Sequence, residues 1–154
     1  MRQFYEVTTK LKDLLYADDN INTVTIGDIS EVDLSKQGIF PLAHIVVGQS
    51  ALNGSTIDMD FTVICMDIVD ITKEDLRDQA EPFYGTNDLQ DIWNTQLAVV
   101  NRLTENLRRG DAFSELYQIS DTITASPFKD RFENLLAGWA IDISISVPNT
   151  EICV

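Results

Sequence analysis

Residues 56–69 constrain the fold of this chain more than any other stretch. Apolar and polar residues alternate in the first half, the period of a strand with one buried face. From residue 63 to 66 both faces become apolar, which is typical of a strand covered on both sides. We therefore expect residues 56–69 to form the central strand of an antiparallel sheet. The apolar positions of the alternating part are Ile57, Met59, Phe61 and Val63.

The dipeptide Asn53-Gly54 comes just before this strand and predicts how the chain enters it. Asn-Gly fits a two-residue type I′ hairpin turn, because both central residues of that turn need a positive φ. A strand over residues 44–50 would lead into the turn. A shorter strand is expected over 23–26, followed by a loop over 27–41, since Pro41 is unsuited to a paired central position.

A second alternating segment near the C-terminus repeats the pattern of the central strand. Its even positions are polar or small and would face outward, beside Asp58 and Asp60. Pro127 is expected to end whatever precedes this strand, and residues 111–124 fit either a short strand or an irregular extension. The positions expected to face inward are Trp139, Ile141, Ile143, Ile145 and Val147.

Two amphipathic helices are expected, over residues 3–16 and 87–109. The long helix begins with a capping-box pattern, Asn87 with Gln90, and ends at Gly110. The sequence thus predicts one α+β domain over residues 1–154, in which both helices pack on one face of a largely antiparallel sheet. The expected apolar stripe of the long helix is Leu89, Ile92, Trp93, Leu97, Val100, Leu103 and Leu107.

The charge balance limits the partners of this chain. There are 25 acidic and 11 basic residues, a formal net charge of −14. Such a chain repels phosphates, so it is unsuited to gripping nucleic acid, although it could surround DNA without adhering to it. Cys65 and Cys153 have no metal-ligand or disulfide-framework spacing, which suits a reducing compartment. No signal peptide or membrane span is expected, so synthesis and folding would occur in the cytoplasm.

Several strand carboxylates invite a metal-site interpretation. Acids on one face of a strand could hold Mg²⁺ in a hydrolase or nuclease, but no acid-x-Lys spacing follows this strand. The favoured interpretation is a polar sheet face in water, so no metal ligand is expected. His44, the single histidine, is expected to be a packed or edge-strand residue, and no catalytic or cofactor-binding residue is expected. The acids in question are Asp58, Asp60, Asp67, Asp70 and Asp142.

The outer face of the sheet is the most suggestive surface in the sequence. Asp58, Asp60, Asp142 and Ser144 would make it acidic and rich in hydroxyl groups. In a ring of subunits this face could line a channel for DNA, and it would equally fit a face that is exposed only to water. Arg108 and Arg109 are expected to complement the helix dipole or to contact a neighbouring subunit. The loops 27–41 and 78–87 are candidates to order against neighbours.

Several runs resemble a known family: residues 24–28 (VTIGD), 39–45 (IFPLAHI), 65–70 (CMDIVD), 94–111 and 130–139. They are similar to structural proteins from the neck or tail of tailed bacteriophages, as in crAss-like phages of Bacteroidetes hosts. The resemblance covers residues 23–149 and extends to tail-terminator and tail-completion proteins. It implies a virion protein that forms a ring of six or twelve copies between portal and tail, around the DNA channel, without catalytic residues or cofactors.

Two other functions stay open from the sequence alone. One is a metal-dependent hydrolase that uses the strand carboxylates, and metal binding would reveal it. The other is a phage-encoded regulatory binding module, which would bind a cellular protein and form no ring of its own. The virion protein is expected to contact itself, portal or connector proteins and tail proteins, with no membrane contact.

Overall fold

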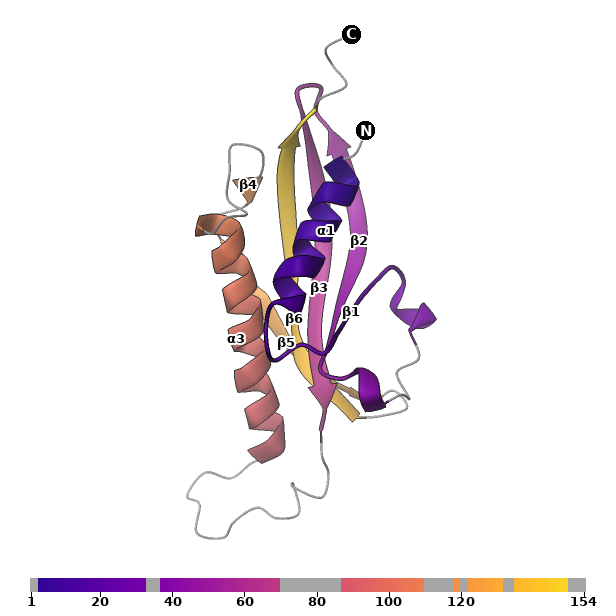
Figure 1. Ribbon diagram of the computed structural model, residues 1–154, viewed down its shortest axis with the longest axis vertical. Helices are drawn as coiled ribbons and strands as arrows, with labels where there is room; N and C mark the ends of the chain where they lie inside the picture. The colour runs from indigo at the N-terminus through magenta and orange to yellow at the C-terminus, as the bar shows by residue number, and fades with distance from the viewer. Residues whose placement is uncertain are drawn as a thin grey trace.

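The computed structural model describes residues 3–32, 37–69, 87–109, 118–119, 122–131 and 135–149, and it confirms the α+β class. Figure 1 shows the helices and strands of these residues. The helices are α1 (Gln3–Tyr16) and α3 (Asn87–Arg109), with short 3-10 turns at Ile29–Glu31 and Gln37–Ile39. The strands are β1 (Thr23–Ile26), β2 (Leu42–Leu52), β3 (Thr56–Ile68), β4 (Gln118–Ile119), β5 (Ala125–Arg131) and β6 (Leu135–Pro148).

The six strands form one mixed sheet in the order β1-β2-β3-β6-β4, and β5 also pairs with β6. Among the strands that the structure describes, only the β1–β2 pair is parallel. β3 is the central strand, as expected, because β2 and β6 both pair with it along most of its length. The largely antiparallel sheet expected from the sequence is therefore confirmed, and the two alternating segments pair with each other within it.

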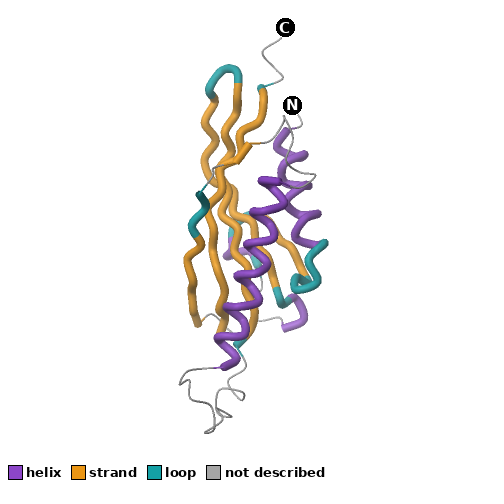
Figure 2. Tube along the Cα trace, turned by 90° about the vertical axis from the view of Figure 1, so that its left-hand side faces the viewer, coloured by secondary structure: helices purple, strands orange, loops and turns teal. Residues whose placement is uncertain are grey.

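Both helices cover the same face of the sheet, which confirms the expected layering (Figure 2). Figure 2 shows the two helices on one side of the strands and the sheet on the other. The inward positions of β3 and β6 are buried, since both strands keep the period of two. The main core consists of these residues with others from the helices, β2 and the segment before β1: Val7, Leu11, Leu15, Ile21, Ala43, Ile45, Val99, Val100, Leu103, Leu107, Ile57, Met59, Phe61, Val63, Cys65, Ile141, Ile143, Ile145 and Val147.

One end of the outer face is also covered. Leu42, Met66 and Leu136 are buried there together with Phe40, and they form a second core. This confirms the expectation that the far end of β3 is covered on both faces. Loop 27–41, a candidate to order against neighbours, packs within the subunit here through four of its apolar side chains: Ile29, Val32, Ile39 and Phe40. Residues 78–86 of the other loop lie outside the described part of the chain.

The β2–β3 hairpin does not contain the expected type I′ turn. Residues 53–55 separate the strands, and only Gly54 among them has a positive φ, of 81°. The Asn53 N–H donates to the Thr56 carbonyl at 3.0 Å, and the Ser55 N–H donates to the Asn53 carbonyl at 3.0 Å. The tight turn is therefore centred on Gly54 alone, the residue that reaches this φ without a steric cost.

The buried stripe of α3 differs from the expected one at one turn. Leu97 is 41% exposed, whereas Gln96 is completely buried. A helical face advances by three or four residues, so a buried face that contains Ile92 and Val100 passes through position 96. The expectation for Leu97 was therefore wrong, because its position on the helix outweighs its apolar chemistry.

Pro127 does not end a strand, and the expectation that it would do so was wrong. It lies within β5, opposite Trp139 of β6. The position is tolerable because, among the strands that the structure describes, β5 pairs with β6 alone and so lies at an edge, where a missing N–H leaves no second ladder unsatisfied. The two tryptophans expected in the core are partly buried, and their ring N–H groups link this region. Trp93 donates to the Phe128 carbonyl at 3.2 Å, and Trp139 donates to the Trp93 carbonyl at 2.8 Å.

Candidate functional site

The predicted polar residues come together at the hairpin end of the outer face. Register pairs across β3 and β6 place Asp58 opposite Ser146, Asp60 opposite Ser144 and Thr62 opposite Asp142. Each pair joins one acid to one hydroxyl group, because both strands carry polar residues at their even positions. We call these six residues the acid–hydroxyl face.

Hydrogen bonds fix the acids at the two ends of this face. Asp58 accepts from Ser146 Oγ and, at 2.7 Å, from Asn53 Nδ2 in the turn. Thr62 Oγ1 donates to Asp142 Oδ1 at 2.6 Å. Two of the three carboxylates of the face are thus held in place by hydrogen bonds.

The surface is hollowed over part of this face. A depression of about 480 Å³ lies over Asp60 and Asp142, two side chains that are exposed to solvent. Residues of β2, β3 and β6 and of the segment before β5 line this depression. Its polar lining consists of Gln49, Asp60, Thr62, Thr122, Asp142 and Ser144.

The strand carboxylates considered as a metal site are not gathered around one point in the described part of the chain. Within the described residues, no group of three or more His, Cys, Asp or Glu side chains is placed to hold a metal ion. Asp67 Oδ1 accepts from the Ile68 N–H at 2.8 Å, and Asp70 lies outside the described part of the chain. Among the described acids, Asp58, Asp60 and Asp142 share a face as single charges beside hydroxyl groups.

His44 is packed, as expected, and lies on the covered part of the outer face. It has no exposed surface, and its Nε2 donates to the Gly27 carbonyl at 2.9 Å. Because Nε2 carries the proton, Nδ1 accepts from the Thr25 hydroxyl, 2.6 Å away. Burial lowers the pKa of His44, although the Gly27 bond and the charge of Asp28 oppose this change. The ring is a neutral structural link between β1 and β2.

Cys65 is a structural residue of the main core. Its side chain is buried and free, and burial raises the pKa of its thiol to about 12. A thiol with such a pKa is not a nucleophile at neutral pH. Cys153 lies outside the described residues.

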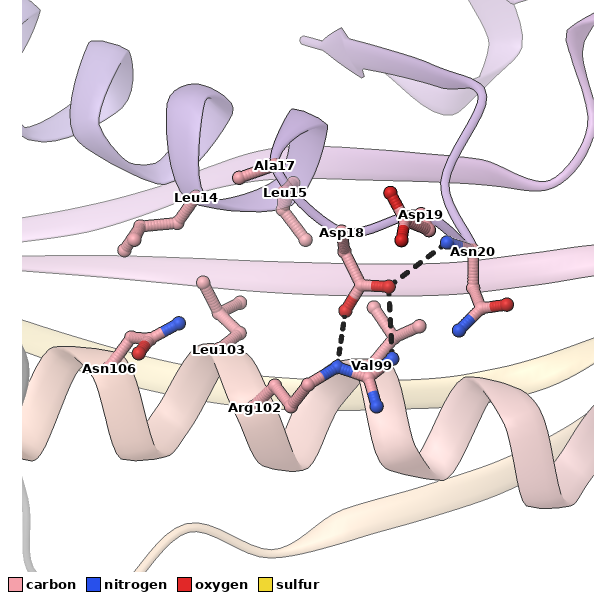
Figure 3. A pocket seen from close by; sticks show the side chains of 10 residues that line it. All are labelled: Leu14, Leu15, Ala17, Asp18, Asp19, Asn20, Val99, Arg102, Leu103 and Asn106. Atoms are coloured by element: carbon pink, nitrogen blue, oxygen red, sulfur yellow. Dashed lines mark hydrogen bonds and ion pairs between the residues drawn. The ribbon is translucent and has the colours of Figure 1, made fainter.

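A second hollow lies between the end of α1 and the middle of α3 (Figure 3). Its volume is about 350 Å³, and leucines 14, 15 and 103 form its apolar part. Figure 3 shows the carboxylate of Asp18 facing the guanidinium of Arg102 across this hollow. Two bonds join them, Nε to Oδ2 at 2.7 Å and Nη2 to Oδ1 at 2.9 Å. We call this hollow the helix pocket.

The electrostatics of the helix pocket follow from that bidentate ion pair. Partial burial by itself would raise the pKa of the Asp18 carboxyl, but hydrogen bonds from Arg102 and the Asn20 N–H outweigh it, so the pKa is lowered. The hydrogen bond to Asp18 raises the pKa of the Arg102 guanidinium. The Asp18 side chain is only 8% exposed, whereas Arg102 is 48% exposed. The pair links the turn after α1 to α3, and no short-range sequence signal indicates it.

Of the two arginines predicted to contact a neighbour, the structure describes one side chain. Arg108 Nη1 lies 3.4 Å from Glu105 Oε1, one helical turn away, and its buried Nε has no hydrogen-bond partner among the described residues. Only the backbone of Arg109 is described. Both residues occupy the last turn of α3, where a positive charge complements the helix dipole.

None of the helices in the described part of the chain has the length and apolar character that crossing a membrane requires.

Comparisons with known proteins do not assign this chain to a family. No family model matches the sequence, and no curated protein matches it significantly. Among solved structures, the nucleotide-free catalytic domain of the histidine kinase ThkA aligns over 94% of this chain and 92% of that one. The sequence identity is 10% and the TM-score is 0.25, a similarity that carries no argument about fold or function.

Proposed function

We propose that this chain is a non-enzymatic structural protein of a tailed-phage virion. It forms a ring in the head-to-tail connector or at the tail end, where it joins portal-side and tail proteins around the DNA channel. The family resemblance of residues 23–149 motivates this role, and the α+β architecture is compatible with it. The virion is then its location.

The acid–hydroxyl face is the observation that carries the proposal. A DNA channel needs walls that do not bind phosphate, and fixed negative charges repel it. Asp58, Asp60 and Asp142 supply such charges along one face, and hydroxyl groups between them keep the surface wetted. The core lies on the other side of the sheet, so this face is free to line a lumen.

Two measurements test the ring. Purified protein should have the mass of six or twelve copies by light scattering, and mature particles should contain the chain by mass spectrometry. A monomer at all concentrations, or absence from mature particles, would contradict the proposal.

A charge-reversal pair tests which face lines the channel. Asp60→Lys with Asp142→Lys should create rings that retain DNA at low salt, because each substitution replaces a negative charge on this face with a positive one. The matched control is Asp13→Lys with Asp19→Lys, which makes the same change at exposed acids near the end of α1. Fluorescence anisotropy with short duplex DNA gives both affinities. Equal DNA binding by the two variants would show that the acid–hydroxyl face has no special position.

A further inference from the structure

We infer that the free edge of β2, with the apolar side chains beside it, is a surface that contacts a second copy of this chain. The inference rests on the proposed ring and names one of the surfaces through which neighbouring subunits of that ring contact each other.

Much of β2 has a strand partner on one side only. β1 pairs with its first four residues, so within the described residues positions 46–52 pair with β3 alone. Figure 1 shows β2 continuing towards the hairpin beyond the level of β1. A strand edge of this kind presents unpaired N–H and C=O groups that are able to bond another chain.

Four exposed apolar side chains lie beside this edge. Val47 pairs with Phe61 and Leu52 with Ile57, and both partners belong to the core under the helices, so Val47 and Leu52 face the helix side. The Phe4 ring reaches the same place, since its centroid is 6.2 Å from that of Phe61, and the Tyr5 ring contacts it, with its centroid 6.4 Å from that of Phe4. We call these four residues the edge patch, with their exposed fractions: Phe4 37%, Tyr5 71%, Val47 42% and Leu52 77%.

The net charge of the chain indicates which partner contacts the edge patch. Two chains of net charge −14 repel each other least where the facing surfaces are uncharged. Residues 46–52 and the edge patch contain no charged side chain at all. A basic partner would be attracted to the acid–hydroxyl face instead, so this neutral surface favours a second copy of the same acidic chain.

The geometry limits how the two copies meet. A closed ring needs contacts between two different surfaces of each subunit. The outer edge of β4 could supply the second surface, because it lies at the same end of the sheet as residues 46–52 but on the side opposite β2. The β2 edge has a bulge between Val47 and Ser50, which interrupts regular strand addition. Burial of the edge patch must therefore supply much of the affinity, with few backbone bonds.

Substitutions in the edge patch test this surface. Leu52→Asp and Tyr5→Asp introduce charge at the two most exposed positions of the patch, where the fold of the subunit has little to lose. Each should weaken self-association by about tenfold or more. The matched controls are Tyr16→Asp and Leu97→Asp, at residues that are 49% and 41% exposed elsewhere. Light scattering over a dilution series gives the dissociation constants, and circular dichroism checks the fold.

The outcomes separate this inference from the ring itself. Wild-type oligomers that are weakened by the patch variants and not by the controls support the inference. Wild-type rings that tolerate both patch variants overturn the inference and leave the ring intact, whereas a monomeric wild type overturns both. Amide hydrogen exchange of the wild type adds a readout without substitutions. Residues 46–52 should exchange more slowly in the oligomer than after dilution, and unchanged rates would count against the edge.

Discussion

The two ends of the outer sheet face differ, although β3 and β6 form both of them. At the hairpin end, the even positions carry acids and hydroxyl groups and face a hollow open to solvent. At the other end, Met66 and Leu136 are buried beneath the segment that leads into β2. Strand alternation decides which face a side chain takes, and the connecting segment decides whether that face is covered. One part of the sheet thus holds the fold together, and another part is available for function.

Gly138→Ala should show the largest effect at the covered end. A Cβ at this position would collide with the backbone carbonyl of Cys65 on the neighbouring strand, so the strands would have to separate. We expect a loss of about 4 kcal/mol in the free energy of unfolding. Gly38→Ala is the control, because nothing lies within 4 Å of the place that its Cβ would take. Urea denaturation measures both, and equal stability of the two variants would contradict the close packing.

Leu136→Ala compared with Ser144→Ala tests the two ends on a single strand. Leu136 has no exposed surface, and its truncation should cost about 3 kcal/mol through lost burial and a cavity. Ser144 is half-buried on the acid–hydroxyl face, and its loss should change stability by less than about 0.5 kcal/mol. Thermal and urea unfolding give both values. Similar costs at the two positions would mean that the polar end is as important to the fold as the apolar end.

The helix side of the sheet differs in another way, because a buried polar side chain there lacks a hydrogen bond. Gln96 is completely buried, and within the described residues neither its amide nitrogen nor its oxygen has a hydrogen-bond partner. Gln96→Leu should therefore stabilise the protein, by about 2 kcal/mol. The control is Asn94→Leu, an exposed site on the same helix, with an expected change of less than about 0.5 kcal/mol. Destabilisation by Gln96→Leu would indicate a bound water or another partner for the amide.

The pH dependence of His44 should be the smallest of these effects. Its pKa is lowered from 6.5 in the folded state, mainly by burial, so protonation favours the unfolded chain. The stabilisation is complete above pH 6.5 and is lost as the pH falls through the lower, folded pKa. Unfolding free energies between about pH 8 and 5 should decline more steeply for the wild type than for His44→Gln. Parallel curves would show that the imidazole is not kept neutral by the fold.

The sequence predicts this sheet well because its patterns are local and long. Residues 56–69 and 139–147 carry their alternation over many positions, and the burial of the inward residues from 141 to 147 agrees with it. Apolar chemistry alone predicts the wrong face for Leu97, because the buried position of that turn belongs to Gln96. Pro127 is misleading in a similar way, since its meaning depends on whether the strand lies at an edge.

The parts of the surface that depend on distant contacts could not be predicted. The acid–hydroxyl face could be predicted from the sequence, because Asp58, Asp60, Asp142 and Ser144 lie on two strands with a clear alternating pattern. The ion pair between Asp18 and Arg102 joins residues 84 apart in sequence, and each has an ordinary local role as turn and helix residue. Only the packing of α1 beside α3 brings them together.

Electron cryo-microscopy of the assembled protein tests the central claim most directly, because it shows where the acid–hydroxyl face lies. We expect a closed ring in which Asp58, Asp60 and Asp142 point into the lumen. A ring with these carboxylates on its outer wall, or buried between subunits, would contradict that claim.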